Sequence, residues 1–101
     1  MMIVKQHKTM DGRLMLAICD SDLKGKKFSE KELQLDLSSD FYDGEEKAEE
    51  VIVELFKIAY IVNLVGEKSV GLGIKEGVIE KEHVIKIKGI PHAQCVIVRE
   101  E

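Results

Sequence analysis

The residues best suited to chemistry in this chain lie together near its carboxyl end, in the segment GIPHAQC at residues 89–95. A histidine and a cysteine three positions apart, His92 and Cys95, could serve as base and nucleophile or as metal ligands. Zinc sites need about four ligands, however, and the apolar neighbours of Cys95 disfavour a reactive thiolate. In the alternative, structural interpretation, the imidazole of His92 bonds a backbone carbonyl. Because we place His92 in a turn at the end of a sheet, it is the best candidate for a functional side chain.

The second candidate is the acidic segment from Asp36 to Glu54, which holds eight carboxylates and one lysine. A calcium-binding EF-hand loop needs oxygen ligands at its first, third and fifth positions, glycine at the sixth and glutamate at the twelfth. With Asp43 at the fifth position, Ser39 and Phe41 fall on the first and third, so the motif fails. We therefore predict no metal site and no cofactor, and we assign the acidic side chains to a helix start with a solvated face.

The third candidate is a tight turn in the segment NLVGEKS at residues 63–69, which we place between two helices. This placement is similar to that of the GxxG loop of KH domains, which clamps a nucleic-acid backbone. Ser69 replaces the second glycine, and Glu67 brings a negative charge to the place of the phosphates. RNA binding through Gly66 to Ser69 and a plain helix–helix turn are the two alternatives.

Basic side chains gather in the first third of the chain, most densely at Lys24, Lys26 and Lys27. Residues 1–30 carry a net charge of +2, whereas residues 31–101 carry −6. This asymmetry could orient an encounter with RNA or with an acidic partner. The cluster lacks the interleaved aromatic residues that stack nucleic-acid bases, so a solvated loop is the alternative.

Length and composition exclude several classes of protein. A chain of 101 residues with 45% hydrophobic residues predicts a single domain spanning residues 1–101. A net charge of −4 argues against DNA binding. The longest nearly apolar run, Ile58 to Val65, is too short to cross a membrane, and the first residues lack a signal-peptide pattern, so we expect a cytoplasmic protein. Cys19 and Cys95 are expected to be buried thiols rather than a disulfide.

The elements that must position these residues begin with a predicted hairpin. Strands are expected at residues 2–6 and 13–19, joined by a turn at Asp11-Gly12. The alternating leucines of residues 33–37 predict a third strand with one solvated face. Residues 20–30, between the second and third strands, are expected to form a solvated loop.

The second half of the chain predicts both helices. Apolar residues recur at steps of three and four over residues 43–65, which predicts a long helix capped by Gly66. A short helix is expected at residues 69–77, followed by strands at 85–88 and 94–98. The order βββααββ predicts an α+β two-layer sandwich, with a mixed or antiparallel sheet of about five strands, one long helix and one short helix. Charged strand positions favour a solvated second face.

Five blocks of the sequence carry a family resemblance. They are LAICD at residues 16–20, LKGKKF at 23–28, FYDGE at 41–45, NLVGE at 63–67 and IPHAQ at 90–94. On these blocks the chain resembles, over nearly its whole length, a small archaeal family known as domain of unknown function 424. Gly71 and Gly73 depart from the family pattern. The resemblance implies a compact α+β domain without an assigned activity, and it suggests that polar residues at segment ends meet on one side of the sheet.

We therefore expect a non-catalytic cytoplasmic binding module that docks a protein or ribonucleoprotein partner, with the translation apparatus as one candidate. The predicted binding residues are Asp20, Lys24, Lys26, Tyr42, Asp43, Asn63, Glu67, His92 and Gln94. A small enzyme that uses His92 beside a carboxylate is the first alternative. RNA binding through the Gly66 turn is the second, and a structural role as an oligomer subunit, signalled by an apolar exposed sheet face, is the third. The oligomeric state itself is not predicted.

Overall fold

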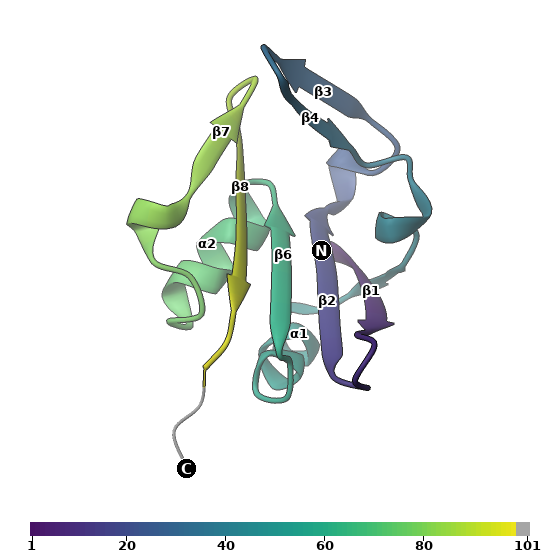
Figure 1. The fold of residues 1–101 in the computed structure, drawn as a ribbon, viewed down its shortest axis with the longest axis vertical. Helices are drawn as coiled ribbons and strands as arrows, with labels where there is room; N and C mark the ends of the chain where they lie inside the picture. The colour runs from purple at the N-terminus through teal and green to yellow at the C-terminus, as the bar shows by residue number, and fades with distance from the viewer. Residues whose placement is uncertain (99–101) are drawn as a thin grey trace.

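The computed structural model describes residues 1–98. Within them the chain forms a six-stranded mixed sheet, a separate two-stranded sheet and two α-helices (Figure 1). The main sheet has the spatial order β5 (Glu45–Lys47), β1 (Met2–Lys8), β2 (Leu14–Asp20), β6 (Ile61–Val65), β8 (Ile90–Val96) and β7 (Ile85–Ile87). The smaller sheet is the hairpin of β3 (Lys27–Glu30) and β4 (Leu33–Asp36), and the helices are α1 (Glu49–Phe56) and α2 (Glu67–Lys75).

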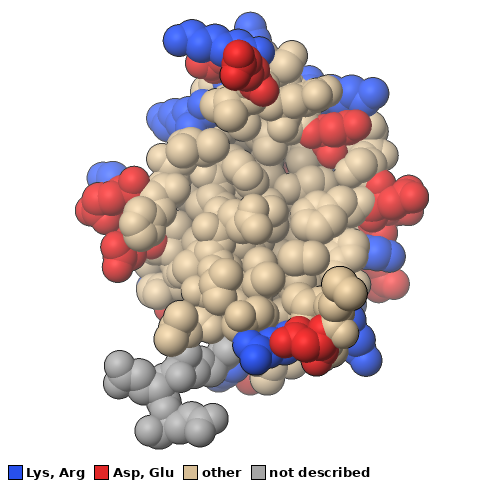
Figure 2. All heavy atoms as spheres, in the orientation of Figure 1, with Lys and Arg blue, Asp and Glu red and all other residues tan. Residues whose placement is uncertain are grey.

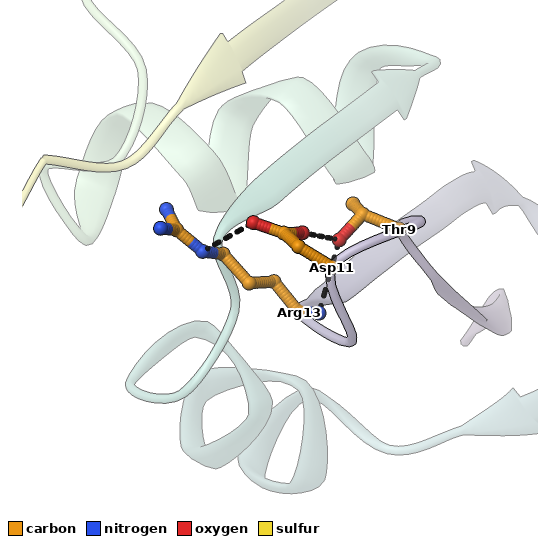
Figure 3. Close-up of polar contacts among 3 residues, drawn as sticks. All are labelled: Thr9, Asp11 and Arg13. Atoms are coloured by element: carbon orange, nitrogen blue, oxygen red, sulfur yellow. Dashed lines mark hydrogen bonds and ion pairs between the residues drawn. The ribbon is translucent and has the colours of Figure 1, made fainter.

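The predicted N-terminal hairpin is confirmed. Strands β1 and β2 pair antiparallel from Met2 opposite Asp20 to Lys8 opposite Leu14. Side chains of the connecting turn hold it closed (Figure 3): the Thr9 hydroxyl donates to the Asp11 carboxylate, and Arg13 Nε lies 3.0 Å from Asp11 Oδ2. The Thr9 hydroxyl oxygen also accepts a hydrogen bond from the backbone N–H of Arg13 at 3.0 Å. These contacts link residues on both sides of the turn that joins the two strands.

The predicted long helix over residues 43–65 is wrong, and it is the main correction to the fold. Residues 45–47 form the edge strand β5 against β1, α1 covers only Glu49–Phe56, and Ile61–Val65 is the central strand β6. Strand β6 runs parallel to β2, with Ala17 opposite Asn63, and antiparallel to β8. The predicted order βββααββ and the count of five strands are therefore not confirmed.

The error has a physical cause in the apolar run that ends at Val65. Nearly consecutive apolar residues suit a strand that is covered on both faces, whereas an amphipathic helix would interrupt them with polar positions. The β-branched residues Ile61, Val62 and Val65 add to the preference for a strand. The predicted helix is therefore replaced by the two-turn helix α1 and a buried strand, so Gly66 follows a strand and is the N-cap of α2.

Both helices pack on one face of the main sheet. Ile52 and Phe56 of α1 and Val70 and Leu72 of α2 join a buried cluster with residues from β1, β2, β6 and β8. In the view of Figure 1 the helices lie behind the sheet. The short helix predicted at residues 69–77 is confirmed as α2, which begins two residues earlier.

The second face of the sheet is covered at one end, so the predicted solvated face is correct only in part. The β3–β4 hairpin and the 3₁₀ turn Asp40–Tyr42 cover that end and form a second buried cluster with the sheet. The cluster comprises Ile3, Ala17, Cys19, Leu35, Leu37, Tyr42, Val65 and Ile87. Strand β3 lies inside the predicted loop 20–30, so that part of the loop prediction is wrong.

The last two strands form a hairpin whose turn differs from the prediction. Strand β7 pairs with β8 from Ile85 opposite His92 to Ile87 opposite Ile90, so Lys88 and Gly89 make the turn. Pro91 and His92 therefore lie inside β8 and not in a turn. In the described part of the chain, no helix is long and apolar enough to span a membrane.

Candidate binding face and the cap of helix α2

The carboxylate of Asp20 holds the start of helix α2. Asp20 is the last residue of β2 and is only 6% exposed. Its Oδ2 accepts the backbone N–H of Lys68 at 3.0 Å, and its Oδ1 accepts the backbone N–H and the hydroxyl of Ser69, both at 2.8 Å. A negative charge at the positive end of a helix dipole is favourable, so Asp20 ties the central sheet to α2.

Gly66 allows this close approach between β2 and α2. Its φ angle is +108°, and a Cβ atom at this position would lie 2.3 Å from Cγ of Asp20. The predicted turn between two helices is thus a strand-to-helix connection. The amides that a KH-like loop would offer to a phosphate are already bonded to the carboxylate of Asp20, and the predicted site residue Glu67 is exposed beside them. This geometry does not support RNA binding through Gly66 to Ser69.

Three of the predicted binding residues, Tyr42, Asn63 and Gln94, form a hydrogen-bonded network across the sheet. The Tyr42 hydroxyl donates to Asn63 Oδ1 at 2.7 Å, and Asn63 Nδ2 donates to Gln94 Oε1 at 3.4 Å. Asn63 is 8% exposed, whereas Gln94 is exposed. Burial raises the pKa of Tyr42, so its hydroxyl remains a proton donor at every physiological pH. This hydrogen-bonded network therefore runs from the buried phenol of Tyr42 to the solvent-exposed amide of Gln94.

His92 lies two positions before Gln94 in β8, on the same face of the strand. Its Nδ1 is 3.0 Å from the carbonyl oxygen of Leu64, as in the structural alternative, and burial lowers the pKa of the imidazole. No ion pair joins His92 to a carboxylate within residues 1–98. Cys95 is three positions along the same strand and so points to the opposite face, where it packs against the helix-side core. His92 and Cys95 therefore do not face each other as a base and a nucleophile would.

The charged binding residues lie at the border of the sheet. Lys24 Nζ is 3.5 Å from Asp43 Oδ1, and both side chains are exposed, so this pair contributes little to stability. Lys26 is exposed and follows the 3₁₀ turn Ser21–Leu23. Within residues 1–98, neither lysine side chain forms a hydrogen bond with the Tyr42–Asn63–Gln94 network. Within residues 1–98, no group of three or more His, Cys, Asp or Glu side chains is placed to hold a metal ion.

Across β2, β6 and β8, the part of the sheet that the β3–β4 hairpin leaves uncovered carries no charged side chain, and Lys5 of β1 borders it on the same face, opposite Ala17. Across β2, β6 and β8, Met15 lies opposite Ile61, which lies opposite Val96, and the next row contains Asn63 and Gln94. We call these five residues the open sheet face. Val96 is 47% exposed, and Met15 and Ile61 are half-buried. Figure 2 shows this side of the molecule, with uncharged atoms over the middle and most charged groups at the periphery.

Sequence analysis identified two residues of the open sheet face, Asn63 and Gln94, and missed the other three. Met15, Ile61 and Val96 occur in apolar runs that look like core, because no single run reveals which positions the hairpin will leave uncovered. The alternating pattern of β8 was the available signal. It places Gln94 and Val96 on the same face as Ile90 and His92, once the strand is known to begin at Ile90.

Comparison with known proteins places the chain in a family. The model of a family described as protein of unknown function (DUF424) matches residues 7–98. Among solved structures, the crystal structure of an uncharacterized conserved protein from Methanopyrus kandleri is similar, with a TM-score of 0.79 and 26% identity over 99% of this chain and 94% of that one. The comparison with curated proteins gives no match. The resemblance seen in the five sequence blocks is confirmed, and the chain belongs to the DUF424 family of proteins of unknown function.

Proposed function

We propose that this protein is a non-catalytic cytoplasmic binding module that docks a protein or ribonucleoprotein partner through its open sheet face. One observation carries the proposal. Charged residues make up 34% of the chain, yet none of the five residues of the open sheet face is charged. Three of these residues, Met15, Ile61 and Val96, are apolar side chains that remain at least partly exposed to water.

This composition supports contact with the protein part of such a partner. The centres of protein–protein interfaces are depleted in charged residues, and a polar rim surrounds them. Direct contact with nucleic acid depends instead on lysine and arginine side chains that neutralise phosphates. The amide of Gln94 adds a directional hydrogen-bonding group among apolar neighbours, which is the kind of group that selects one orientation of a partner.

The test uses two valines of similar exposure on opposite sides of the molecule. Val96 is 47% exposed on the open sheet face, and Val51 is 44% exposed on helix α1. Wild-type protein, Val96→Lys and Val51→Lys are each immobilised and incubated with an extract of the native archaeal host. Thermal melts of both variants check that they are folded.

We expect one protein or ribonucleoprotein to be retained by the wild type and by Val51→Lys. The amount of this partner retained by Val96→Lys should be lower by about tenfold or more, because the lysine would be buried in the interface without a partner charge. Equal retention by Val96→Lys and by the wild type would exclude the open sheet face as the docking surface.

A further inference from the structure

The open sheet face has the chemistry to bind a second copy of itself. We propose that two copies of the chain pair through this face, around a twofold axis that passes close to Gln94. The inference rests on the proposed function, since it accepts the open sheet face as a docking surface and names its occupant. In a twofold dimer the same patch is used by both copies, so the patch must be complementary to itself.

The first argument is the direction of the hydrogen bonds that end at Gln94. The Tyr42 hydroxyl donates to Asn63 Oδ1, which turns Asn63 Nδ2 towards Oε1 of Gln94. Gln94 is exposed, and within residues 1–98 its Nε2 donates no hydrogen bond, so its two N–H groups are available to a partner, while its Oε1 retains a second lone pair. An amide held in this way can donate to Oε1 of the partner's amide and accept from its Nε2. Two copies of Gln94 across a twofold axis therefore satisfy each other.

The second argument is charge. Each copy has a net charge of −4, so two copies repel each other at long range. The open sheet face adds no like charges to this repulsion because its five residues are uncharged (Figure 2). An acidic or basic partner would find no opposite charge among these residues, whereas a second copy offers an equally neutral surface. The exposed side chain of Val96 adds apolar area on both sides of the axis.

The dimer is tested by sedimentation equilibrium of the full chain over about 5–500 µM, the range in which weak dimers separate from monomers. Gln94→Glu is the most specific variant. Its carboxylate still accepts from Asn63 Nδ2, so the fold is preserved, but it removes the outward donors and sets two like charges against each other at the axis. Val96→Lys is the second variant, and Val51→Lys on helix α1 is the control for an added lysine.

We expect the wild type and Val51→Lys to reach twice the chain mass of 11.4 kDa at the higher concentrations. Gln94→Glu and Val96→Lys should each raise the dissociation constant about tenfold or more at pH 7. Because the glutamate repulsion requires ionised carboxylates, lowering the pH to about 4 should restore part of the dimer of Gln94→Glu.

Two results would overturn the inference: a monomer mass for the wild type at every concentration, or a dimer that both variants leave intact. A monomeric wild type whose capture of a host partner still depends on Val96 would defeat the dimer alone and leave the proposed function standing. A dimer sensitive to Gln94→Glu, together with no Val96-dependent capture, would defeat docking of another protein and leave the dimer.

Discussion

At the scale of single residues, buried polar groups in this protein are hydrogen-bonded to specific partners. In the described part of the chain, no buried side-chain nitrogen or oxygen lacks a hydrogen-bond partner. Sequence analysis selected Asn63, Tyr42, Gln94 and His92 as polar residues among apolar ones, but it could not pair them. Their partners come from segments 21 to 31 residues apart, and such pairing depends on the sheet order, which the sequence does not show.

The first prediction concerns His92 and pH. Burial holds the pKa of the folded imidazole below 6.5, so the unfolded chain binds this proton more readily. The contribution of His92 to the free energy of unfolding is therefore complete above the unfolded pKa of about 6.5. It is lost as the pH falls from there towards the lower pKa of the folded state. Urea unfolding of the wild type at pH 7.5, 6.5 and 5.5 should show a decreasing free energy of unfolding.

The control for this prediction compares two histidines. His92→Gln should flatten the decrease, whereas His83→Gln, which changes an exposed residue, should leave it as in the wild type. A pH dependence that is unchanged by His92→Gln would contradict the assignment.

The second prediction concerns the hydroxyl of Tyr42. Tyr42→Phe removes the donor to Asn63 Oδ1 and leaves a nearly buried acceptor unpaired, which costs about 1–3 kcal/mol of unfolding free energy. Tyr60→Phe is the control, because its ring would still lie under the Arg13 guanidinium, which is 4.2 Å from the ring centre. The Tyr60 change should be within about 0.5 kcal/mol. Equal effects of the two substitutions in urea unfolding would disprove the role of the Tyr42 hydroxyl.

At the scale of elements, the hairpin of β1 and β2 and the short helix α2 could be predicted from sequence, and the long helix could not. Asp11-Gly12 is a strong local turn signal, so the hairpin follows from neighbouring residues. The segment 43–65 combines a genuine two-turn amphipathic helix with a buried strand. Both are apolar, and what separates them is the central position of β6 in the sheet, with the helix-side core on one face and the second buried cluster over Val65 on the other.

The third prediction tests the link between β2 and α2. Asp20→Asn keeps the size of the side chain but replaces one acceptor oxygen by a donor, which then faces a backbone N–H. We expect a loss of about 1–3 kcal/mol in the free energy of unfolding. Asp22→Asn changes an exposed carboxylate two residues away and should cost less than about 0.5 kcal/mol. If urea unfolding gives the two variants the same stability, Asp20 does not hold α2.

The fourth prediction uses two glycines of helix α2. A Cβ at Gly71 would have no atom within 4 Å, so Gly71→Ala should stabilise the protein by about 0.5–1 kcal/mol through helix propensity. A Cβ at Gly73 would lie 2.5 Å from Leu64 Cδ1, and Leu64 is fully buried. Gly73→Ala should therefore cost about 1–3 kcal/mol. In chemical unfolding, we expect Gly71→Ala to raise the free energy of unfolding and Gly73→Ala to lower it. A Gly73→Ala variant that is more stable than the wild type would refute the close packing of α2 against Leu64.

At the scale of the whole molecule, the two faces of the main sheet are covered to different extents. One face is buried under both helices, and the other is covered at one end by the β3–β4 hairpin, which leaves the open sheet face to solvent. The net charge of −4 and the acidic helix start were visible in the sequence. The uncharged surface was not, because it is assembled from three strands that are distant in the chain.

The most direct measurement of the central claim is site-specific photo-cross-linking. A photoreactive phenylalanine analogue replaces Val96 on the open sheet face or, in the matched variant, Val51 on α1, and the host cells are irradiated. The account predicts a discrete cross-linked product from position 96, with a second copy or with another protein, and none from position 51. Products from position 51 with none from position 96 would contradict it.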